Sequence, residues 1–508
     1  MSLAVVASRS LDGLRAPPVQ VEVQLANGLP SFTLVGLADT EVKEARERVR
    51  AALQQSGFAF PHNKRITVNL APADLPKESG RFDLPIALGI LAAAGAIDLA
   101  ALARCEFAGE LSLAGELRPV RGALALALAL RREGPERALV LPAESARAAA
   151  QVAGVNVLAA HNLAEVVRAL LPGDAAVPLV RALRRPAQAA PADGLDLRDV
   201  RGQAGAKRAL EVAAAGGHSL LLIGPPGTGK TMLAQRLSGL LPPLDEDLAL
   251  QSAALRGLSS LGFDDRHFGQ RPLRAPHHSA SAAALIGGGS PPRPGEVSLA
   301  HGGVLFLDEL PEFPRAALEA LREPLESGHI TLSRAARQAS YPARFQLIAA
   351  MNPCPCGYFG AGAAAMRECR CSPDQVGRYH SRLSGPLMDR IDLQIEVLAV
   401  SPAALLALPE GEASSVVAAR VAAARQRQML RQRCANAELE PAQIARYCAT
   451  DEAANRFLLT AAERLGWSGR RLHRSLKVAR TIADLAGAAE VGVAAIAETL
   501  QMQRVVQR

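Results

Sequence analysis

The segment GPPGTGKT at residues 224–231 combines the residue types that bind the phosphates of a nucleotide. It follows the apolar run 219–223, as expected for a phosphate-binding loop between a strand and a helix. Its glycines allow backbone N–H groups to surround the phosphates, Lys230 reaches the β- and γ-phosphates, and Thr231 offers a hydroxyl to Mg²⁺. The predicted ATP-binding residues are Gly224, Pro225, Pro226, Gly227, Thr228, Gly229, Lys230 and Thr231.

A second segment, VLFLDE at residues 304–309, supplies the acidic groups that such a site needs. Residues typical of a buried strand deliver Asp308, which is placed to hold the Mg²⁺ shell, and Glu309, which is placed to orient and deprotonate the attacking water. The two segments occur in the expected order and context. Together they predict an α/β core that acts as an ATP-driven motor.

Length and composition limit what the rest of the chain can be. Its 508 residues suffice for about three domains, and its 49% apolar residues suffice for well-packed cores. The start MSLAVVASRSLDG lacks the features of a signal peptide, and no apolar stretch reaches the roughly 18 residues that span a bilayer, so a soluble cytoplasmic protein is expected. A net charge of +8 fits a polyanionic partner but is weak evidence, because the excess is spread along the chain.

Residues 183–194, LRRPAQAAPADG, are rich in proline and alanine and lack hydrophobic periodicity, which predicts a linker. Before it, residues 1–182 alternate short strand-like runs with helical stretches, which predicts a compact α/β domain. After it we expect the motor core over 195–395 and a helical lid over 396–508. Within the first domain the expected strands are 19–25, 31–35, 66–70 and 139–141, and the expected helices are 39–55, 82–94 and 123–132.

Long strings across the chain resemble the ComM/YifB family, the magnesium-chelatase-like AAA+ proteins of bacteria. They include VQLANGLPSFTLVGLADTEVKEARERVRAAL, FDLPIALGILAAAG, RPLRAPHHSASAAALIGGG, SGPLMDRIDL and RSLKVARTIADLAG, and they extend over essentially the whole chain. The resemblance implies a hexameric ring that hydrolyses ATP with Mg²⁺ to move along single-stranded or branched DNA. It also implies branch migration in homologous recombination and natural transformation, with recombination proteins as further partners.

Two other classes of function compete with this reading. A remodeller like the magnesium-chelatase I subunit uses the same core to drive a protein partner, but that class lacks the first domain and the cysteine quartet described below. A purely regulatory DNA-binding protein is disfavoured because Lys230, Asp308 and Glu309 are all intact.

The first domain also resembles the proteolytic domain of Lon, most clearly at GELSLAGELRPVRGAL, residues 109–124. Lon-type chemistry needs a serine nucleophile and a lysine base. Here Arg81 stands where the serine belongs and Leu124 where the lysine belongs, whereas Ser79 is displaced and has no evident base. We therefore expect a Lon-protease-like α+β domain that is not catalytic, and that shapes the ring or recruits DNA or partners.

The interval between the two nucleotide motifs leaves room for structure beyond one helix and one strand. It contains many small residues and a turn at 287–289, which cannot form a core of their own. The resemblance implies an insert within the second helix of the motor, a loop that projects into the central pore, with Gly288 as a candidate DNA contact. A disordered surface loop is the alternative. His277 and His278 have no spaced acidic partner and are interpreted as packing or polar-contact residues rather than metal ligands.

Two β-prone runs, 330–332 and 345–348, flank a basic turn that contains Arg334 and Arg337. The pattern predicts a hairpin that presents cations. Related ring motors use such a hairpin to grip or split nucleic acid, so the resemblance makes both arginines candidate DNA contacts. An ordinary solvated turn is the alternative.

Asn352 ends the next strand, where its side chain can hydrogen-bond the γ-phosphate or the attacking water, the sensor-1 role that the family implies. By the same resemblance, Arg390 is the arginine finger that reaches the neighbouring subunit's site, with Arg382 as the alternative. Arg470 is the expected sensor 2 of the lid, and Arg471 is its rival because the more usual Ser-Ala-Arg-Ala reads SGRR here. A surface arginine is the alternative for each assignment.

Four of the seven cysteines fall in one short stretch, as Cys354-Pro-Cys356 and, after a glycine-rich loop, Cys369-Arg-Cys371. Paired thiolates around a loop that has no hydrophobic reason to fold predict a Cys₄ structural zinc site. Four reduced thiols beside the sensor are the alternative. Because Asn352 lies just before the first thiol, loss of the metal is expected to disturb the ATP site.

Overall fold

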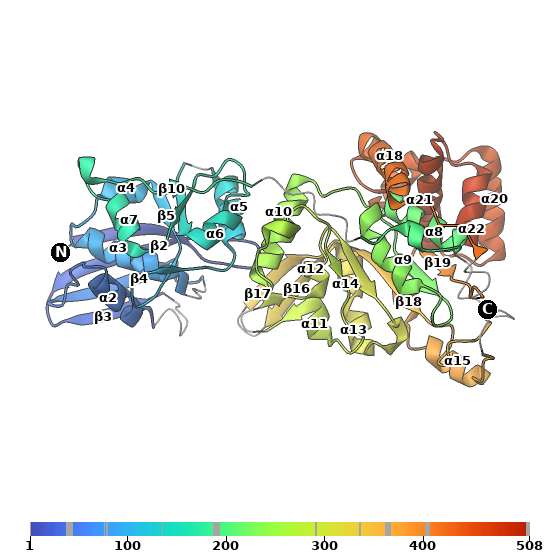
Figure 1. The fold of residues 1–508 in the computed structure, drawn as a ribbon, viewed down its shortest axis with the longest axis horizontal. Coiled ribbons are helices and arrows are strands. Elements are labelled where there is room, and N and C mark those ends of the chain that lie inside the picture. Colours follow the sequence, from blue (N-terminus) through green and yellow to red (C-terminus); the bar gives the residue numbers. More distant parts are fainter. Residues whose placement is uncertain are drawn as a thin grey trace. The chain divides into compact units, whose positions relative to one another are not determined.

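The computed structural model describes residues 2–36, 44–75, 77, 80–134, 136–185, 194–289, 292–334, 337–360, 367–401 and 407–503. The chain forms two compact units (Figure 1), and the first consists of Met1–Ala189 together with Ala249–Gly269 and Ala335–Tyr341. Each unit is built around a sheet of its own. Most of the predicted linker lies outside the described residues, and the predicted domain boundaries remain predictions.

The first unit is built on a mixed eight-stranded sheet. Its strands are β1 (Ser2–Arg9), β2 (Pro18–Asn27), β3 (Ser31–Val35), β4 (Lys64–Ala71), β5 (Cys105–Phe107), β8 (Ala138–Pro142), β9 (Val157–Ala160) and β10 (Val180–Arg181), and a separate ribbon pairs β6 (Glu110–Leu111) with β7 (Leu117–Arg118). The order in the sheet is β10-β9-β8-β5-β1-β2-β4-β3. β2 lies between β1 and β4, antiparallel to both, and buries every second side chain, as a strand with one face on the core does.

Helices cover the sheet of the first unit. They are α2 (Ala45–Gln55), α3 (Asp83–Ala93), α4 (Leu99–Ala103), α5 (Ala123–Glu133), α6 (Ala143–Ala149) and α7 (Leu163–Ala169). α3 is buried along its whole length and packs on β1 and β2 (Figure 1). A Cβ on Gly89 would lie 2.5 Å from a methyl carbon of Val23, so a glycine is needed where this helix approaches the sheet. The predicted strands and the helices at 82–94 and 123–132 are confirmed, whereas the predicted helix 39–55 lies partly outside the described residues.

The second unit contains a parallel five-stranded sheet. Its strands, in their order across the sheet, are β12 (Leu273–Arg274), β15 (Val304–Leu307), β18 (Gln346–Met351), β11 (Leu220–Ile223) and β19 (Leu393–Glu396). All residues of β11, β15 and β18 are buried, because helices cover both faces of a parallel sheet. The carboxyl ends of parallel strands meet at one edge, so the segments that follow β11, β15 and β18 are brought together there.

Two groups of helices complete this unit. Those of the sheet core are α8 (Ala204–Gly216), α9 (Lys230–Arg236), α11 (Ala282–Ile286), α12 (Glu296–Leu299), α13 (Arg315–Ala320), α14 (Arg322–Ser327), α15 (Pro373–His380) and α16 (Gly385–Met388), whereas most of α10 (Glu246–Leu258) belongs to the first unit. Those of the C-terminal lid are α18 (Ser414–Gln432), α19 (Pro441–Tyr447), α20 (Glu452–Arg464), α21 (Gly469–Ala486) and α22 (Val493–Gln501). α18 and α21 pack on α8, and one hydrophobic core joins the lid to the sheet. The mixed α/β class with an AAA+ core and a helical lid is therefore confirmed.

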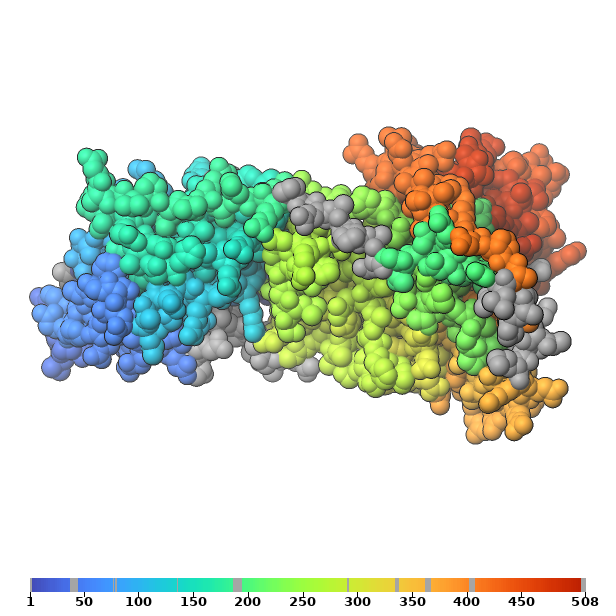
Figure 2. Space-filling model, in the orientation of Figure 1, coloured from blue at the N-terminus to red at the C-terminus, as the bar shows by residue number. Residues whose placement is uncertain are grey.

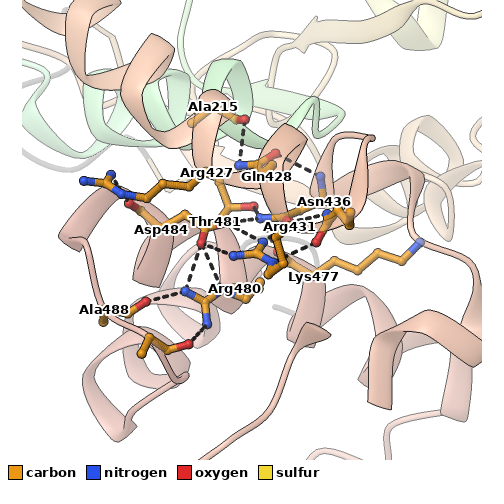
Figure 3. A network of polar contacts seen from close by, with 12 residues as sticks. Ala215, Arg427, Gln428, Arg431, Asn436, Lys477, Arg480, Thr481, Asp484 and Ala488 are labelled. Carbon is orange, nitrogen blue, oxygen red and sulfur yellow. Dashed lines mark hydrogen bonds and ion pairs between the residues drawn. The ribbon is translucent and has the colours of Figure 1, made fainter. Parts of the chain in front are cut away.

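A buried polar network joins α18 to α21 (Figure 3). The carboxylate of Asp484 accepts hydrogen bonds from Arg431 at 2.7 and 2.9 Å, from Arg480 at 2.9 and 3.1 Å and from Asn436 at 2.8 Å. Arg480 also donates to the carbonyls of Ala488 and Ala489. A charged network that is satisfied on every side in this way fixes one arrangement of the lid helices.

The basic hairpin differs from the prediction in its second arm. β16 (His329–Arg334) pairs with β17 (Arg337–Pro342), whereas residues 345–348 belong mainly to the central strand β18. The sequence RQASYP of β17 has little β propensity, but Ala339 and Tyr341 alternate with exposed neighbours and are buried. The apolar run after it was misassigned because a fully buried central strand has the same composition as a hairpin arm.

Candidate nucleotide-hydrolysis site

The loop 224–231 connects β11 to α9, as its sequence predicts. Gly227 and Gly229 have φ angles of 77° and 87°, a backbone conformation that favours glycine. A Cβ on Gly224 would lie 2.3 Å from the carbonyl oxygen of Val397, so this position also excludes a side chain. The loop can therefore turn its backbone toward a phosphate group only with glycine at these positions.

Lys230, the first residue of α9, is buried and its ammonium group has three acceptors. Nζ donates to the carbonyl oxygens of Gly224 and Pro225 at 2.7 and 2.8 Å and to Oδ1 of Asn352 at 3.1 Å. Burial lowers the pKa of Lys230 to about 8, and the nearby carboxylates of Asp308 and Glu309 oppose that shift. Asn352, which follows β18, thus lies beside Lys230, and its role as sensor 1 stays a prediction.

The acidic residues after β15 face the same loop. The hydroxyl of Thr231 donates to Oδ2 of Asp308 at 2.7 Å, so the two predicted Mg²⁺ ligands already contact each other. Hard oxygen ligands of this kind suit Mg²⁺, which takes one or two protein oxygens and completes its shell with phosphate oxygens and water. The residues present therefore fit the cation that the motifs imply.

Glu309 has an unusual backbone and a partner that the sequence did not reveal. Its φ of 52° lies in the left-handed region, which is uncommon for a residue other than glycine and recurs at functional sites. Its Oε2 lies 3.0 Å from Nδ1 of His278, and its backbone N–H donates to Asp308 at 2.9 Å. His278 therefore has the acidic partner that was not expected for it, although its interpretation as a polar-contact residue holds.

The two candidate arginine fingers lie in different surroundings. Arg390, after α16, donates to the carbonyl of Pro386 at 2.7 Å and pairs with Glu326. The hydrogen bond from Arg390 is the main reason why the pKa of Glu326 is lowered. Arg382 instead donates to Glu312 at 2.7 Å. Both arginines are bound to side chains of this chain, so the structure leaves the choice between them a prediction.

The two candidate sensor-2 residues begin α21. Arg470 lies close enough to Glu326 to contribute to the lowering of that carboxyl pKa. Arg471 is 5.2 Å from the ring centre of Trp467 and donates to the carbonyl of Gln503 at 3.1 Å. Arg471 is therefore held within the lid, whereas Arg470 lies on the side of Glu326, and the assignment of sensor 2 to Arg470 stays a prediction.

The four clustered cysteines come together as predicted. Sγ of Cys354 lies 3.3 Å from that of Cys356 and 3.8 Å from that of Cys369, and all four Sγ atoms, including that of Cys371, lie within 4.8 Å of one another. A tetrahedron with Zn–S bonds of about 2.3 Å places its sulfur atoms about 3.8 Å apart, whereas a disulfide needs about 2.05 Å. These thiols therefore fit a Zn²⁺ ion and do not fit disulfides.

The surroundings of the cysteine cluster also favour a metal site. The backbone N–H of Phe359 donates to Sγ of Cys354 at 3.4 Å, and that of Cys371 donates to Sγ of Cys369 at 3.5 Å, contacts that stabilise thiolates. α15 follows directly and projects from the surface of the second unit, in light orange in Figure 2. A metal would hold this projecting segment to the end of β18, next to Asn352.

The candidate DNA contacts are only partly described. Gly288 belongs to β13 (Gly287–Gly288), which pairs with β14 (Arg293–Pro294) in a short ribbon between α11 and α12. A Cβ on Gly295 would lie 2.2 Å from the backbone nitrogen of Gly287, so the base of this insert needs glycine. Arg334 and Arg337 end β16 and begin β17, and their side chains lie outside what the structure describes.

The two Lon-type catalytic positions of the first unit hold neither a serine nor a lysine. Arg81 and Leu124, at the two expected catalytic positions, are both buried, and Ser79 lies outside the described residues. In the described part of the chain, no helix has the length and hydropathy that a membrane span requires.

Comparison with known proteins places the whole chain in one family. Residues 196–405 match the family model of magnesium chelatase, subunit ChlI, residues 21–145 match subunit ChlI of Mg-chelatase, and residues 411–503 match the C-terminal part of that subunit. The chain is 50% identical to the protein YifB of Salmonella typhimurium over 96% of its own length and 94% of the relative's. It is 48% identical to the competence protein ComM of Haemophilus influenzae over 100% of its own length and 98% of the relative's.

A weaker similarity links part of the chain to a chelatase. The chain is 29% identical to the magnesium-chelatase 67 kDa subunit of Heliobacterium mobile in an alignment that covers 31% of this chain and 28% of that one. The full-length relatives decide the assignment, because they match both units and the lid. The chain therefore belongs to the ComM/YifB family of magnesium-chelatase-like AAA+ proteins, and this membership implies ATPase activity.

Proposed function

We propose that this chain is an ATP-dependent DNA motor that acts as a hexameric ring and promotes branch migration during homologous recombination and natural transformation. The observation that carries the proposal is the similarity to a competence protein over the whole length of both chains, combined with a complete nucleotide-hydrolysis site. The similarity to a competence protein supports a DNA substrate. DNA in single-stranded or branched form is the proposed partner.

The geometry suggests how each residue takes part in ATP hydrolysis. Lys230 would hold the β- and γ-phosphates, while Thr231 and Asp308 would hold Mg²⁺, which shields the phosphate charge. Glu309 would orient a water molecule and take its proton as the water oxygen bonds to the γ-phosphorus and the bond to the β-phosphate oxygen breaks. Asn352, beside Lys230, is placed to bind the γ-phosphate or that water.

Residues outside the carboxyl edge of the sheet would complete the proposed motor. We assign Arg390 as the finger that stabilises the charge on the γ-phosphoryl group bound by a neighbouring subunit, with Arg470 as sensor 2. Arg334, Arg337 and Gly288 are the proposed DNA contacts. The four cysteines would hold one structural Zn²⁺ that closes the loop after β18.

The alternative is a magnesium-chelatase-like remodeller that acts on a protein partner, which the similarity to the chelatase 67 kDa subunit favours. A mobile four-way junction made of oligonucleotides separates the two functions. We expect the chain with ATP and Mg²⁺ to convert the junction to two duplexes, and Lys230→Ala to fail. A wild-type protein that hydrolyses ATP but leaves the junction intact over a range of protein concentrations would contradict the DNA motor.

A further inference from the structure

Asn352, the residue proposed to contact the γ-phosphate, lies just past the sheet. The ladder between β11 and β18 ends with the pair Ile223 and Met351, so the chain leaves this ladder immediately before Asn352. The side chain of Asn352 faces Lys230, whose Nζ donates to its Oδ1 at 3.1 Å. A side chain that follows a strand in this way keeps one direction only if the backbone beside it is supported.

A histidine at the end of α15 supplies such a support. Nε2 of His380 lies 2.9 Å from the carbonyl oxygen of Pro353, the residue after Asn352. A carbonyl oxygen only accepts, so Nε2 carries the proton in this contact and donates the hydrogen bond. Because Pro353 has no N–H, its carbonyl is the backbone group through which this residue can be held.

The helix that carries His380 is itself held at both ends. A capping box of Ser372 and Gln375 begins α15, with hydrogen bonds of 3.0 and 3.3 Å. Just beyond the end of the helix, Arg382 donates to Glu312, in the segment that follows β15, at 2.7 Å. His380 therefore acts from an anchored helix that links the segments after β15 and β18.

The turn after Pro353 also packs on the phosphate-binding loop. A Cβ on Gly357 would lie 2.7 Å from Cδ of Pro226 and 3.8 Å from Cγ of Asn352. The backbone N–H of Gly357 donates to the carbonyl of Cys354 at 3.0 Å, which closes the turn. Since this turn begins at Pro353 and contacts the Asn352 side chain, a shift of the Pro353 peptide would displace that side chain as well.

We propose that His380 is a positioning residue for Asn352: its Nε2–H holds the Pro353 carbonyl, and so keeps the Asn352 amide directed at the γ-phosphate or the attacking water. This role rests on the proposed function, in which Asn352 takes part in ATP hydrolysis. ADP has no γ-phosphate, so His380 should affect turnover more than ADP affinity. A misplacement of about 1 Å can slow a reaction as much as 100-fold.

The test compares His380→Leu with His380→Gln and with the control Arg378→Leu, which makes the same replacement at an exposed position of the same helix. Circular dichroism and thermal unfolding verify the fold of each variant. If His380→Leu does not fold, His380→Asn takes its place, because its amide is one bond too short to reach Pro353. ATP turnover is measured without DNA at saturating ATP, and the affinity for a fluorescent ADP is measured at equilibrium.

We expect His380→Leu to lower kcat about 10-fold or more while the Kd for ADP changes by less than about two-fold. Glutamine carries its amide N–H the same number of bonds from Cβ as Nε2 of histidine, so His380→Gln should recover kcat to within about three-fold of wild type. Arg378→Leu should also stay within about three-fold.

A double-mutant cycle separates positioning from a general structural effect. Asn352→Ala and the combined variant Asn352→Ala/His380→Leu are assayed at protein concentrations high enough to measure slow turnover. If His380 acts through Asn352, the combined variant should turn over within about two-fold of Asn352→Ala, because the side chain that His380 positions is already absent. Independent effects would instead multiply.

Three results would overturn the role of His380 while leaving the proposed ATPase standing. These are unchanged turnover in His380→Leu, a His380→Gln variant as slow as His380→Leu, and losses that multiply in the combined variant. Wild-type turnover in Asn352→Ala would contradict the sensor-1 role and, with it, the role of His380. A wild-type protein that binds ADP but does not hydrolyse ATP at any protein concentration would instead contradict the proposed function as a whole.

Discussion

Two clusters of charged residues in the second unit are built in opposite ways. At the carboxyl edge of the sheet, Glu309 is 53% exposed and its Oε2 lies 3.0 Å from Nδ1 of His278. In the lid, the side chains of Arg480 and Asp484 are 2% and 1% exposed, and Asp484 accepts hydrogen bonds from three side chains (Figure 3). A charge held by a single partner can exchange that partner for a ligand, whereas a buried charge with several partners cannot do so without a large cost.

This contrast predicts that mutations in the two clusters have different effects. Substitutions of edge residues should slow turnover and spare stability, whereas substitutions in the lid network should reduce stability first. Arg390 belongs with the edge residues. Its carboxylate partner Glu326 is 65% exposed, so Arg390 can exchange this ion pair for a ligand.

The largest effect is expected for Arg390→Ala. A finger that stabilises the transition state from a neighbouring subunit contributes about 10³-fold or more in related phosphoryl transfers, so turnover should fall by that order while ATP binding stays nearly normal. Arg382→Ala is the matched control and should keep most of the activity. A larger loss in Arg382→Ala than in Arg390→Ala would reverse the assignment.

Mixed rings show whether the finger acts across a subunit boundary. Arg390→Ala protein is added to Lys230→Ala protein, each nearly inactive alone, so that some interfaces pair an intact nucleotide site with an intact finger. Partial recovery of hydrolysis is the expected result. A wild-type protein that stays monomeric with ATP and DNA, yet hydrolyses at full rate at every concentration, would rule out a finger in trans.

Glu309→Gln should keep ATP binding and lower turnover by about 10²-fold or more, because the carboxylate that takes the proton is lost while the phosphate loop is unchanged. Its melting temperature should stay close to that of wild type, since an exposed side chain of similar shape is exchanged. Turnover near the wild-type rate would show that another residue is the base.

Asp484→Asn should act mainly on stability. Removing one partner from a buried charge network leaves Arg431 and Arg480 without their counter-charge, which costs about 3–5 kcal/mol of unfolding free energy. The control is Glu452→Gln, which breaks an exposed pair with Arg456 and should change stability by less than about 1 kcal/mol. Equal losses of unfolding free energy in the two variants would show that the buried network stabilises the lid no more than an exposed ion pair does.

The smallest effect on turnover is expected from the proposed zinc site, because the role proposed for it is structural. Elemental analysis of protein purified without added metal should find one zinc per chain, held by the four clustered cysteines. Cys369→Ser should lower the zinc content and weaken turnover moderately, because the loop it closes adjoins Asn352. A zinc content near zero in wild-type protein, both as purified and after supplementation with zinc, would contradict the proposed zinc site.

The sequence predicted those parts of the molecule whose chemistry lies in contiguous residues. The phosphate loop and the segment ending in Asp308 and Glu309 could be recognised because each motif follows an apolar strand. The strands at 31–35 and 66–70 could be recognised from their composition. β1 was not predicted, although it lies at the centre of the first sheet, because its run SLAVVASR at the start of the chain has no turn signal before it.

Two features were missed, one because it depends on the register between distant segments and one because of its composition. The contact of His278 with Glu309 requires that β12 and β15 be parallel neighbours, and β12 has only two residues, too short to be recognised from its composition. The second arm of the basic hairpin was misplaced because RQASYP lacks the β-branched residues typical of strands.

The central claim is that ATP hydrolysis by this chain serves movement on DNA, and ATP turnover with different DNA partners tests it most directly. Steady-state turnover of wild-type protein is measured alone and with single-stranded DNA, forked DNA and a four-way junction, with Glu309→Gln as the blank. The account predicts that at least one of these DNAs stimulates turnover. Turnover that none of these DNAs changes, in protein shown to assemble into a ring, would contradict the account and favour a motor that acts on a protein partner.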